Sequence, residues 1–325
     1  MGDVAIASAG LEDVALTHPN AELHLSTLPP WDQLFVSDPR LSKVISIDVR
    51  GQTQYSATLR WLKAVADEQY DLVIDLQTTD RSRLLLSCLW LIGAQIPRRA
   101  GNKAAIPYNL APKNPPVVRH AMEQLALTLA AAGIEARTPR PVLHYSERRR
   151  TAVQKLFQDL RVEEDYAVFL PGSQAAGYLK RWGADRFIGL ANRIVKQGLK
   201  HVVVLGGPDE IEECERIAQS CGQWLVNLCG QTQLLDIVPI CEGARFIVGN
   251  DTGTAHVAAA AARPMIVICG PTDPLRVLPA GDNVSAMQAP LPCINCYRKH
   301  CGHHSCMAWI TPQDVMDKLK SMGVV

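Results

Sequence analysis

The sequence predicts an α/β protein built from two domains, each with a parallel sheet. Short β-branched runs alternate with amphipathic stretches almost from end to end, a pattern typical of βα units. The alternation breaks around residues 137–141, where prolines cluster, and then starts again. A chain of 325 residues is long enough for two medium domains. We therefore expect one domain over residues 1–145, a second over residues 146–325, and a ligand cleft at the carboxyl ends of their strands.

Each domain has its own series of expected elements. In the first domain, the apolar runs predict strands at 22–26, 43–48 and 71–76 and helices at 55–68 and 119–132. In the second domain, strands are expected at 166–170, 201–205, 245–248 and 264–269, and helices near 147–160, 184–197, 208–220, 233–242 and 253–262. A final helix over 312–322 follows Thr311 and Pro312, a capping residue and a proline at the first helical position.

Composition excludes several classes of protein. A hydrophobic content of 47% and a charged content of 20% are those of an ordinary globular protein. The formal net charge of +1 argues against a dedicated nucleic-acid binder. The longest apolar runs are too short for a transmembrane segment, and the N-terminus does not resemble a signal peptide. Several of the ten cysteines lie in apolar runs, which fits a reducing cytoplasm better than a disulfide scaffold.

Residues 249–256, Gly-Asn-Asp-Thr-Gly-Thr-Ala-His, are the most informative stretch. They follow an apolar run and precede an alanine-rich one, so we expect a buried strand, a tight turn and a helix. Such a turn aims backbone N–H groups at whatever lies beyond the strand end, and phosphate is the usual ligand. The alternative is that Asp251 only caps the helix, with no ligand present.

Three further turns follow expected strands of the second domain. Leu170-Pro-Gly-Ser173 precedes Lys180, which can offer a positive charge to an anion or can remain solvated. The turn 205–210 ends at Glu210, a residue that can complement a helix dipole or accept hydrogen bonds from a ribose. The third turn, 228–232, ends at Thr232. Four such turns on one sheet favour a ligand site, although the full Gly-x-Gly-x-x-Gly fingerprint is absent, which disfavours a dinucleotide oxidoreductase.

The order of these motifs resembles glycosyltransferase family 9, the ADP-heptose:lipopolysaccharide heptosyltransferases. In the second domain the matching residues are Pro171-Gly-Ser173, Lys180-Arg-Trp182, Leu205-Gly-Gly207, Asn227-Leu-Cys-Gly230, Asn250-Asp-Thr-Gly-Thr-Ala-His256 and Gly270-Pro-Thr-Asp-Pro274. In the first domain they are Gly2-Asp-Val4, Tyr70-Asp-Leu-Val-Ile-Asp-Leu-Gln77 and Arg99-Ala-Gly-Asn102. The resemblance therefore covers essentially the whole chain.

The resemblance implies a GT-B fold, in which two Rossmann-like domains face each other across a cleft. It also implies an inverting transfer that needs neither a metal nor another cofactor. The second domain would hold the nucleotide-sugar. There, Ser173 and Lys180 would contact the diphosphate, Glu210 would contact the ribose of adenosine, and Thr232 would line the adenosine site.

The same resemblance assigns the sugar and the chemistry. Asp251 would face the sugar, and Thr252, Gly253 and His256 would lie near the phosphates. Asp3, in a Gly-Asp loop of the first domain, would be the general base. Physical chemistry fits these roles, because the departing diphosphate needs preorganised donors and the acceptor hydroxyl needs a base on its far side. A base and a donor site on different domains would require the cleft to close.

The first domain departs from the family pattern at its start. In the family a buried strand precedes the Gly-Asp loop, whereas here the loop begins at residue 2. That strand is expected at the centre of the first sheet, so Asp3 would hang from a chain end beside the α-amino group of Met1. We expect the first strand to be missing, through the choice of start codon or through genuine loss. The alternative is a member that binds a nucleotide yet transfers poorly.

Two sets of side chains carry weaker hypotheses. The resemblance would let a basic group of the first domain meet the phosphates and carboxylates of an anionic glycolipid, the alternative being scattered solvated charges; its members are Arg81, Arg83, Arg98, Arg99 and Lys103. Four cysteines are spaced C-x2-C-x4-C-x4-C with three histidines among them, but the set fits no standard zinc or iron–sulfur pattern, so reduced thiols or a disulfide are the alternatives to a metal. These are Cys293, Cys296, Cys301 and Cys306.

The sequence thus predicts a cytoplasmic heptosyltransferase that takes ADP-heptose as donor and a lipopolysaccharide inner core as acceptor. Any association with the inner membrane is expected to be peripheral. No nucleic-acid partner is expected. The alternatives are a transferase of another nucleotide-sugar, a sugar-nucleotide epimerase of the same architecture, and a nucleotide-binding member with impaired catalysis. Neither the sugar, the acceptor nor the oligomeric state can be read from the motifs.

Overall fold

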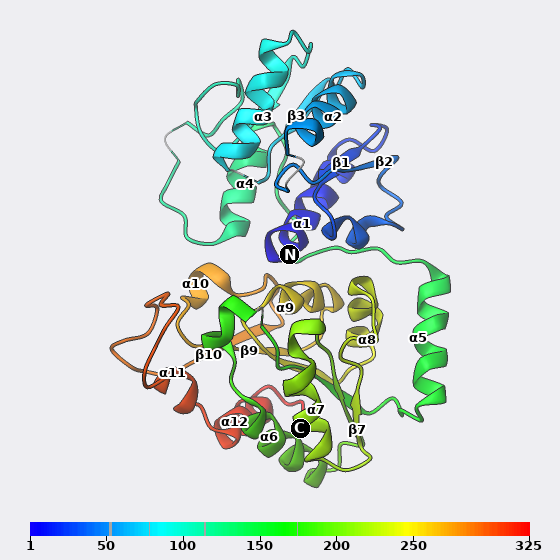
Figure 1. The fold of residues 1–325 in the computed structure, drawn as a ribbon, viewed down its shortest axis with the longest axis vertical. Coiled ribbons are helices and arrows are strands. Elements are labelled where there is room, and N and C mark those ends of the chain that lie inside the picture. The colour runs from blue at the N-terminus through cyan, green and yellow to red at the C-terminus, as the bar shows by residue number, and fades with distance from the viewer. Residues whose placement is uncertain (52–53, 78, 114, 174) are drawn as a thin grey trace. The chain divides into compact units, whose positions relative to one another are not determined.

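The protein is described by a computed structural model over residues 1–51, 54–77, 79–113, 115–173 and 175–325. Its contacts divide the chain into two compact units, both drawn in Figure 1. The N-terminal unit is Asp3–His144, and the C-terminal unit is Tyr145–Val325 together with Met1 and Gly2. Each unit has its own strands and its own buried core.

A six-stranded parallel sheet forms the centre of the C-terminal unit, with the order β10-β9-β8-β5-β6-β7. The strands are β5 (Tyr166–Leu170), β6 (His201–Val204), β7 (Leu225–Asn227), β8 (Phe246–Asn250), β9 (Met265–Cys269) and β10 (Val284–Gln288). β6 and β7 extend the sheet on one side of β5, and β8, β9 and β10 extend it on the other. The order therefore reverses between β5 and β8, and ligands of open α/β sheets bind beyond the carboxyl ends of the strands at such a reversal.

The C-terminal unit also contains helices. They are α5 (Glu147–Asp159), α6 (Ala184–Lys196), α7 (Ile211–Gln219), α8 (Ile237–Glu242), α9 (Gly253–Ala258), α10 (Pro274–Val277), α11 (Ser305–Ala308) and α12 (Pro312–Ser321). Short 3-10 segments are η2 (Ala175–Lys180), η3 (Pro208–Glu210), η4 (Leu234–Asp236) and η5 (Ala259–Ala261). One core cluster joins α6, α7 and α12 to the sheet, with fully buried Trp182 and Phe187 rings whose centroids are 5.0 Å apart. Alternate strand residues face this cluster because successive side chains of a strand point to opposite faces.

The N-terminal unit has two parallel strand pairs. β1 (His24–Thr27) pairs with β2 (Lys43–Ser46), and β3 (Leu72–Ile74) pairs with β4 (Arg98–Ala100). Its helices are α1 (Gly2–Thr17), whose first residue belongs to the C-terminal unit, α2 (Gln54–Ala66), α3 (Asp80–Leu91) and α4 (Ala121–Ala131), and η1 (Trp31–Phe35) is a 3-10 turn. Within the described residues, no strand joins the two pairs and no strand precedes α1.

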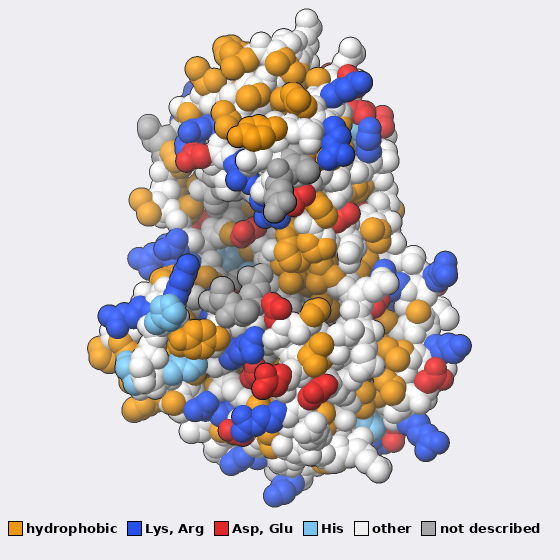
Figure 2. Space-filling view, in the orientation of Figure 1, with side chains coloured by type: hydrophobic (Ala, Val, Ile, Leu, Met, Phe, Trp, Pro, Cys, Tyr) orange, Lys and Arg blue, Asp and Glu red, His pale blue; other side chains and the backbone are white. Residues whose placement is uncertain are grey.

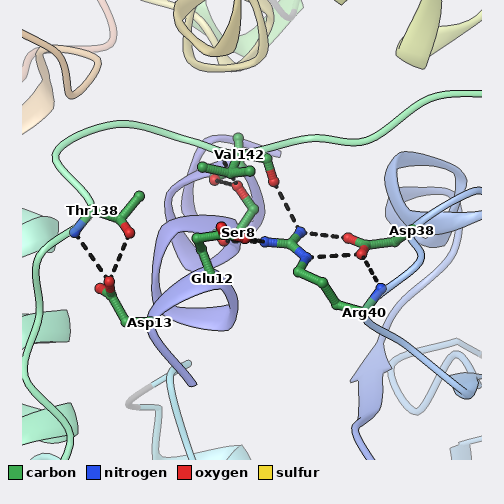
Figure 3. Close-up of polar contacts among 8 residues, drawn as sticks. Ser8, Glu12, Asp13, Asp38, Arg40, Thr138 and Val142 are labelled. Carbon is green, nitrogen blue, oxygen red and sulfur yellow. Dashed lines mark hydrogen bonds and ion pairs between the residues drawn. The ribbon is translucent and has the colours of Figure 1, made fainter. Parts of the chain in front are cut away.

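A buried polar network holds α1 in the N-terminal unit (Figure 3). The Arg40 guanidinium donates to Glu12 on α1 at 2.7 Å and to Asp38 at 2.8 Å, and it also donates to the Val142 carbonyl at 3.0 Å. Asp13 of α1 accepts from the Thr138 hydroxyl at 2.6 Å and from its backbone N–H at 3.1 Å. The segment that leads out of the N-terminal unit is thus bonded to α1 by side chains that are largely screened from water.

The α/β class and the parallel sheet are confirmed, and every strand expected from the sequence has a counterpart. The sequence did not predict the helices α1 and α3 or the strands β4, β7 and β10, nor the short elements α10, α11, η1 and η2. The prediction that Gly2 and Asp3 form a loop is wrong, because Gly2 begins α1 and Asp3 lies in its first turn. A carboxylate in that position complements the positive end of the helix dipole.

Candidate functional site

A small pocket lies at the carboxyl ends of β5, β6 and β8, the point where the strand order reverses. It is lined by Leu170, Gly172, Leu205, Gly206, Glu210, Thr252 and Thr254. Three of the four turns singled out from the sequence therefore meet at one place. Thr232, in the fourth turn, is half-buried just before η4 and is not among the lining residues.

The first turn leaves β5 and is braced by an arginine. Ser173 is 3% exposed, and its hydroxyl donates to the Gly177 carbonyl at 2.8 Å. Arg181 donates to the Ser173 carbonyl at 2.7 Å and to the Asp209 carbonyl at 3.2 Å, so it links the first turn to the second. Its guanidinium also pairs with the Glu213 carboxylate on α7 at 3.3 Å. Burial raises the pKa of Glu213, and Arg181 opposes that rise.

Lys180 and Asp251 form an ion pair across the same strand ends. The distance between Lys180 Nζ and Asp251 Oδ2 is 2.8 Å, and the Thr272 hydroxyl donates to the same oxygen at 2.8 Å. The Asp251 side chain is 4% exposed and that of Lys180 is 33% exposed. The buried carboxylate therefore holds an ammonium group that is still accessible to solvent. Burial, followed by the Asp251 charge, raises the pKa of the neighbouring Cys269 thiol to about 12, which keeps that thiol neutral.

The hypothesis that Asp251 caps the helix is wrong. Thr252 is the N-cap residue of α9, and its hydroxyl oxygen accepts from the Ala255 N–H at 3.4 Å. The carboxylate of Asp251 is engaged instead by Lys180 and Thr272. The expected helix over 253–262 is also shorter: α9 ends at Ala258 and continues as the 3-10 turn η5. His256, in α9, is buried at 7% exposure.

Glu210 folds back over the first turn. Its carboxylate accepts the Gly207 N–H, which closes the 205–210 turn. A Cβ placed on Gly172 would lie 2.0 Å from Glu210 Cγ, so the Glu210 side chain lies against the backbone at Gly172. The absence of a side chain at position 172 is what lets the carboxylate reach the pocket.

Sequence reasoning assigned no role to three residues that hold this arrangement together. Asn250 is fully buried at the end of β8, where its amide group donates to the Gly172 carbonyl at 3.3 Å and accepts the Trp182 N–H at 3.1 Å. Arg181 and Thr272 bond to Ser173 and Asp251 as described. All three stand inside the quoted motifs, so their place beside predicted ligand contacts was the signal that could have found them.

The remaining predicted residues lie in the N-terminal unit. Asp3 is exposed in the first turn of α1. Arg83 and Lys103 both pair with the aspartate that begins α3, at 3.1 and 3.4 Å, and Arg81 is exposed beside it. The guanidinium groups of Arg98 and Arg99 donate to backbone carbonyls of neighbouring segments. Arg98 and Arg99 therefore help to hold the loops around β4 in place.

The four C-terminal cysteines are free thiols, three in the loop before α11 and Cys306 within α11. Cys293 and Cys296 are exposed, and Cys306 is buried. Hydrogen bonds from two backbone N–H groups lower the pKa of Cys301, whereas burial raises that of Cys306. Within the part of the chain that the structure describes, no group of three or more histidine, cysteine or acidic side chains is placed to hold a metal ion.

Comparison with known proteins bears on this site. The sequence model of glycosyltransferase family 9 (heptosyltransferase) matches residues 58–306. Lipooligosaccharide heptosyltransferase 2 of Haemophilus influenzae is 26% identical over 342 aligned residues, covering 99% of this chain and 96% of the relative. Lipopolysaccharide heptosyltransferase 2 of Salmonella typhimurium is 24% identical, over 99% of this chain and 95% of the relative.

Solved structures share the fold. A glycosyl transferase family 9 protein from Veillonella parvula has a TM-score of 0.85 at 19% identity, covering 99% of this chain and 94% of that one. The E. coli heptosyltransferase WaaC with ADP has a TM-score of 0.74 at 22% identity, covering 99% and 96%. These likenesses show the GT-B fold. None of the described helices is both long and apolar enough to cross a membrane. Because the family match spans most of the sequence, this chain belongs to glycosyltransferase family 9, the heptosyltransferases.

Proposed function

We propose that this protein transfers heptose from ADP-heptose to the inner core of lipopolysaccharide, with inversion and without a metal. The observation that carries the proposal is the Lys180–Asp251–Thr272 group beside the pocket at the reversal of strand order. Related heptosyltransferase structures that hold ADP and an ADP-fluoroheptose support the donor. The names of the curated relatives support a lipopolysaccharide acceptor.

The donor diphosphate would lie against Lys180 and the first turn. An ammonium group has three N–H donors, so Lys180 can bond Asp251 and phosphate oxygens together. The carboxylate fixes where the cation stands, and a preorganised cation stabilises charge as it develops on the leaving phosphate. Ser173, Thr252, Gly253 and the region of His256 would complete the phosphate site, while Glu210 and Thr232 would contact the nucleoside.

The acceptor hydroxyl would be activated by Asp3. Its carboxylate would take the proton as the hydroxyl oxygen attacks the anomeric carbon from the face opposite ADP. The bond from that carbon to the diphosphate breaks as the new glycosidic bond forms, and ADP leaves with the electron pair. Attack from the opposite face inverts the anomeric centre. The acceptor phosphates would meet the basic residues of the N-terminal unit, and the enzyme would work in the cytoplasm at the inner face of the membrane.

The test is a transfer assay with ADP-heptose and a purified lipopolysaccharide core acceptor, read by the mass of the product and by released ADP. We expect one heptose per acceptor, a product with inverted anomeric configuration by NMR, and full rates in excess EDTA. Release of ADP only when the acceptor is present excludes an epimerase. Turnover of another nucleotide-sugar with none of ADP-heptose would overturn the donor assignment.

Asp3→Asn tests the base. The amide cannot accept the proton, so kcat should fall by about 10²- to 10⁴-fold while the affinity for ADP is unchanged. Asp67→Asn, at another exposed aspartate of the N-terminal unit, is the matched control and should keep the wild-type kcat. A wild-type kcat in Asp3→Asn would remove Asp3 from the mechanism.

A further inference from the structure

The helix α3 is apolar on two opposite sides. Its inner side buries Leu86 and Leu89, which are 5% and 1% exposed, in a core cluster of the N-terminal unit. Its outer side exposes Leu84 and Leu91, at 63% and 73%. Seven residues are close to two helical turns, so these two side chains share one stripe. A surface helix of a globular protein normally presents polar side chains there, so the outer stripe needs another explanation.

Two more exposed apolar side chains flank Leu91 on either side, because successive helical residues are about 100° apart around the axis. Trp90 and Ile92 are 47% and 60% exposed, and together with Leu84 and Leu91 they form what we call the α3 surface. Figure 2 shows hydrophobic side chains gathered over this part of the N-terminal unit. The adjoining helix α2 also exposes Tyr55 and Leu59, at 81% and 68%. Several exposed apolar side chains on one helix and its neighbour mark an interaction surface more often than single exposed leucines do.

The chain segment that contains this surface has a one-sided charge. Residues 80–119 contain seven lysines and arginines and a single acidic residue, Asp80. The rest of the N-terminal unit has the opposite balance, with seven basic and thirteen acidic residues over 3–79 and 120–144. The unit is therefore neutral as a whole, but its positive charge is concentrated in the segment that holds the α3 surface.

We propose that the α3 surface docks the protein on an anionic lipid bilayer. Leucine and isoleucine side chains would enter the boundary between headgroups and acyl chains, and tryptophan is enriched at that depth. The cations of residues 80–119 would be attracted by the negative headgroups. This proposal deepens the proposed function by naming the surface that brings the enzyme to a lipid-borne acceptor. A second copy of the chain fits less well, because a two-fold contact through this segment would oppose like charges.

The first experiment is sedimentation with vesicles that contain neither acceptor nor donor. Wild-type protein should bind vesicles of equal parts phosphatidylcholine and phosphatidylglycerol, bind phosphatidylcholine alone far more weakly, and be released by salt. Leu84→Ser with Leu91→Ser should lower the partition coefficient at least about tenfold. The control, Leu16→Ser with Leu275→Ser, changes leucines of 65% and 63% exposure on other elements and should bind like wild type.

Equal vesicle binding by the two double variants would overturn the proposal. So would sedimentation without vesicles that only the Leu84 and Leu91 changes abolish, since that would identify a second copy as the occupant. A second measurement uses the wild-type protein and phospholipids brominated on their acyl chains. These should quench tryptophan fluorescence, and Trp90→Phe should lose most of the quenching while Trp309→Phe, at 58% exposure, keeps it. Undiminished quenching in Trp90→Phe would contradict this orientation.

Membrane docking and heptosyl transfer are tested by different measurements, so either one can be refuted without the other. Vesicle binding is measured without a sugar donor, so it stands if heptosyl transfer is absent. Conversely, the Leu84 and Leu91 variant should keep its kcat on a water-soluble acceptor fragment and show a raised KM only for an acceptor embedded in vesicles. An unchanged KM for the embedded acceptor would count against docking, with the transfer activity intact.

Discussion

At the scale of single residues, one carboxylate oxygen fixes the position of the Lys180 ammonium group. Asp251 Oδ2 accepts from both Lys180 and Thr272, at 2.8 Å in each case. A buried carboxylate is costly unless its oxygens are bonded, so each donor keeps the other in place. We therefore propose that Thr272 is a positioning residue, which would act on the donor phosphate through Asp251 and Lys180.

Thr272→Val tests that role. Valine keeps the shape of threonine but removes the hydroxyl, so Asp251 loses one bond and holds Lys180 less firmly. Hydrogen bonds to charged groups contribute about 1.5–3 kcal/mol, so kcat/KM for ADP-heptose should fall about tenfold or more in steady-state assays. Thr151→Val, on the exposed face of α5, should leave it unchanged. A fall in the melting temperature with no kinetic change would mean that Thr272 serves stability alone.

Gly172→Ala tests the close approach of Glu210. The new Cβ would lie 2.0 Å from Glu210 Cγ and 2.4 Å from Cδ, so the Glu210 side chain must leave the pocket edge. Because that side chain is flexible, the melting temperature should change little, while ADP should bind about tenfold more weakly by calorimetry, the loss of about one charged hydrogen bond. Gly302→Ala, where a Cβ meets nothing within 4 Å, is the control. Unchanged ADP binding would place Glu210 outside the nucleotide site.

At the scale of elements, α1 depends on buried charge. The Asp38 side chain is fully buried and that of Arg40 is 8% exposed, so removing the guanidinium leaves carboxylates without their partner. Breaking a buried pair in this way costs about 3–5 kcal/mol. Arg40→Met should therefore lower the free energy of unfolding by about 3 kcal/mol in urea melts. Arg50→Met, which breaks the exposed pair with Asp48, should cost under about 1 kcal/mol. Equal costs would show that the network does not hold α1.

The ion pair between Arg181, which follows η2, and Glu213 on α7 predicts a pH dependence. Burial raises the pKa of Glu213, so the folded protein binds this proton more tightly than the unfolded chain does. Stability should then fall as pH rises from the ordinary glutamate value, about 4.3, through the raised folded value. Glu213→Gln should remove this part of the slope in urea melts at several pH values, and Glu212→Gln should keep it. Because Arg181 opposes the rise in the pKa of Glu213, Arg181→Met should raise that pKa further and extend the loss of stability to higher pH. An unchanged pH range for this loss would show that the ion pair contributes nothing.

The C-terminal sheet could be predicted because its strands are buried on both faces. β5, β8 and β9 consist entirely of buried residues, which appear in the sequence as continuous apolar runs. β10 is only partly buried at the sheet edge and β7 and β4 have three residues each, so they lack such runs. Helix α1 was missed because its apolar residues are spread around the helix instead of forming a stripe.

The site could be predicted only as far as its turns. Strand ends in a parallel sheet share one edge, so Lys180, Glu210 and Asp251 could be expected near one another. Which side chain bonds which could not, because that depends on how far the turns fold back. The N-cap of α9 is Thr252, one residue after Asp251, which the sequence had offered as the cap. The Asp251 carboxylate therefore pairs with Lys180 instead. The asymmetric charge of 80–119 was visible in the sequence, but the exposed stripe beside it required the fold.

At the scale of the whole molecule, the proposed donor site and the proposed base lie on different units. The pocket and the Lys180–Asp251 pair belong to the C-terminal unit, and Asp3 belongs to the N-terminal unit. Changes at the donor site should therefore alter nucleotide affinity, and changes at the base should alter kcat alone. The α3 surface lies on the unit that would carry the acceptor, so lipid binding and nucleotide binding are expected to be separable.

The donor site is tested most directly by calorimetric titration of the nucleotides ADP, UDP, GDP and CMP into wild-type protein, Lys180→Met and Lys200→Met. Lys200 is an exposed lysine of the same unit that pairs with Glu163 at the surface. The proposed function predicts that ADP binds more tightly than UDP, GDP or CMP, and that Lys180→Met weakens ADP binding by about tenfold or more while Lys200→Met does not. Wild-type affinity for ADP in Lys180→Met, or binding of UDP in preference to ADP, would contradict it.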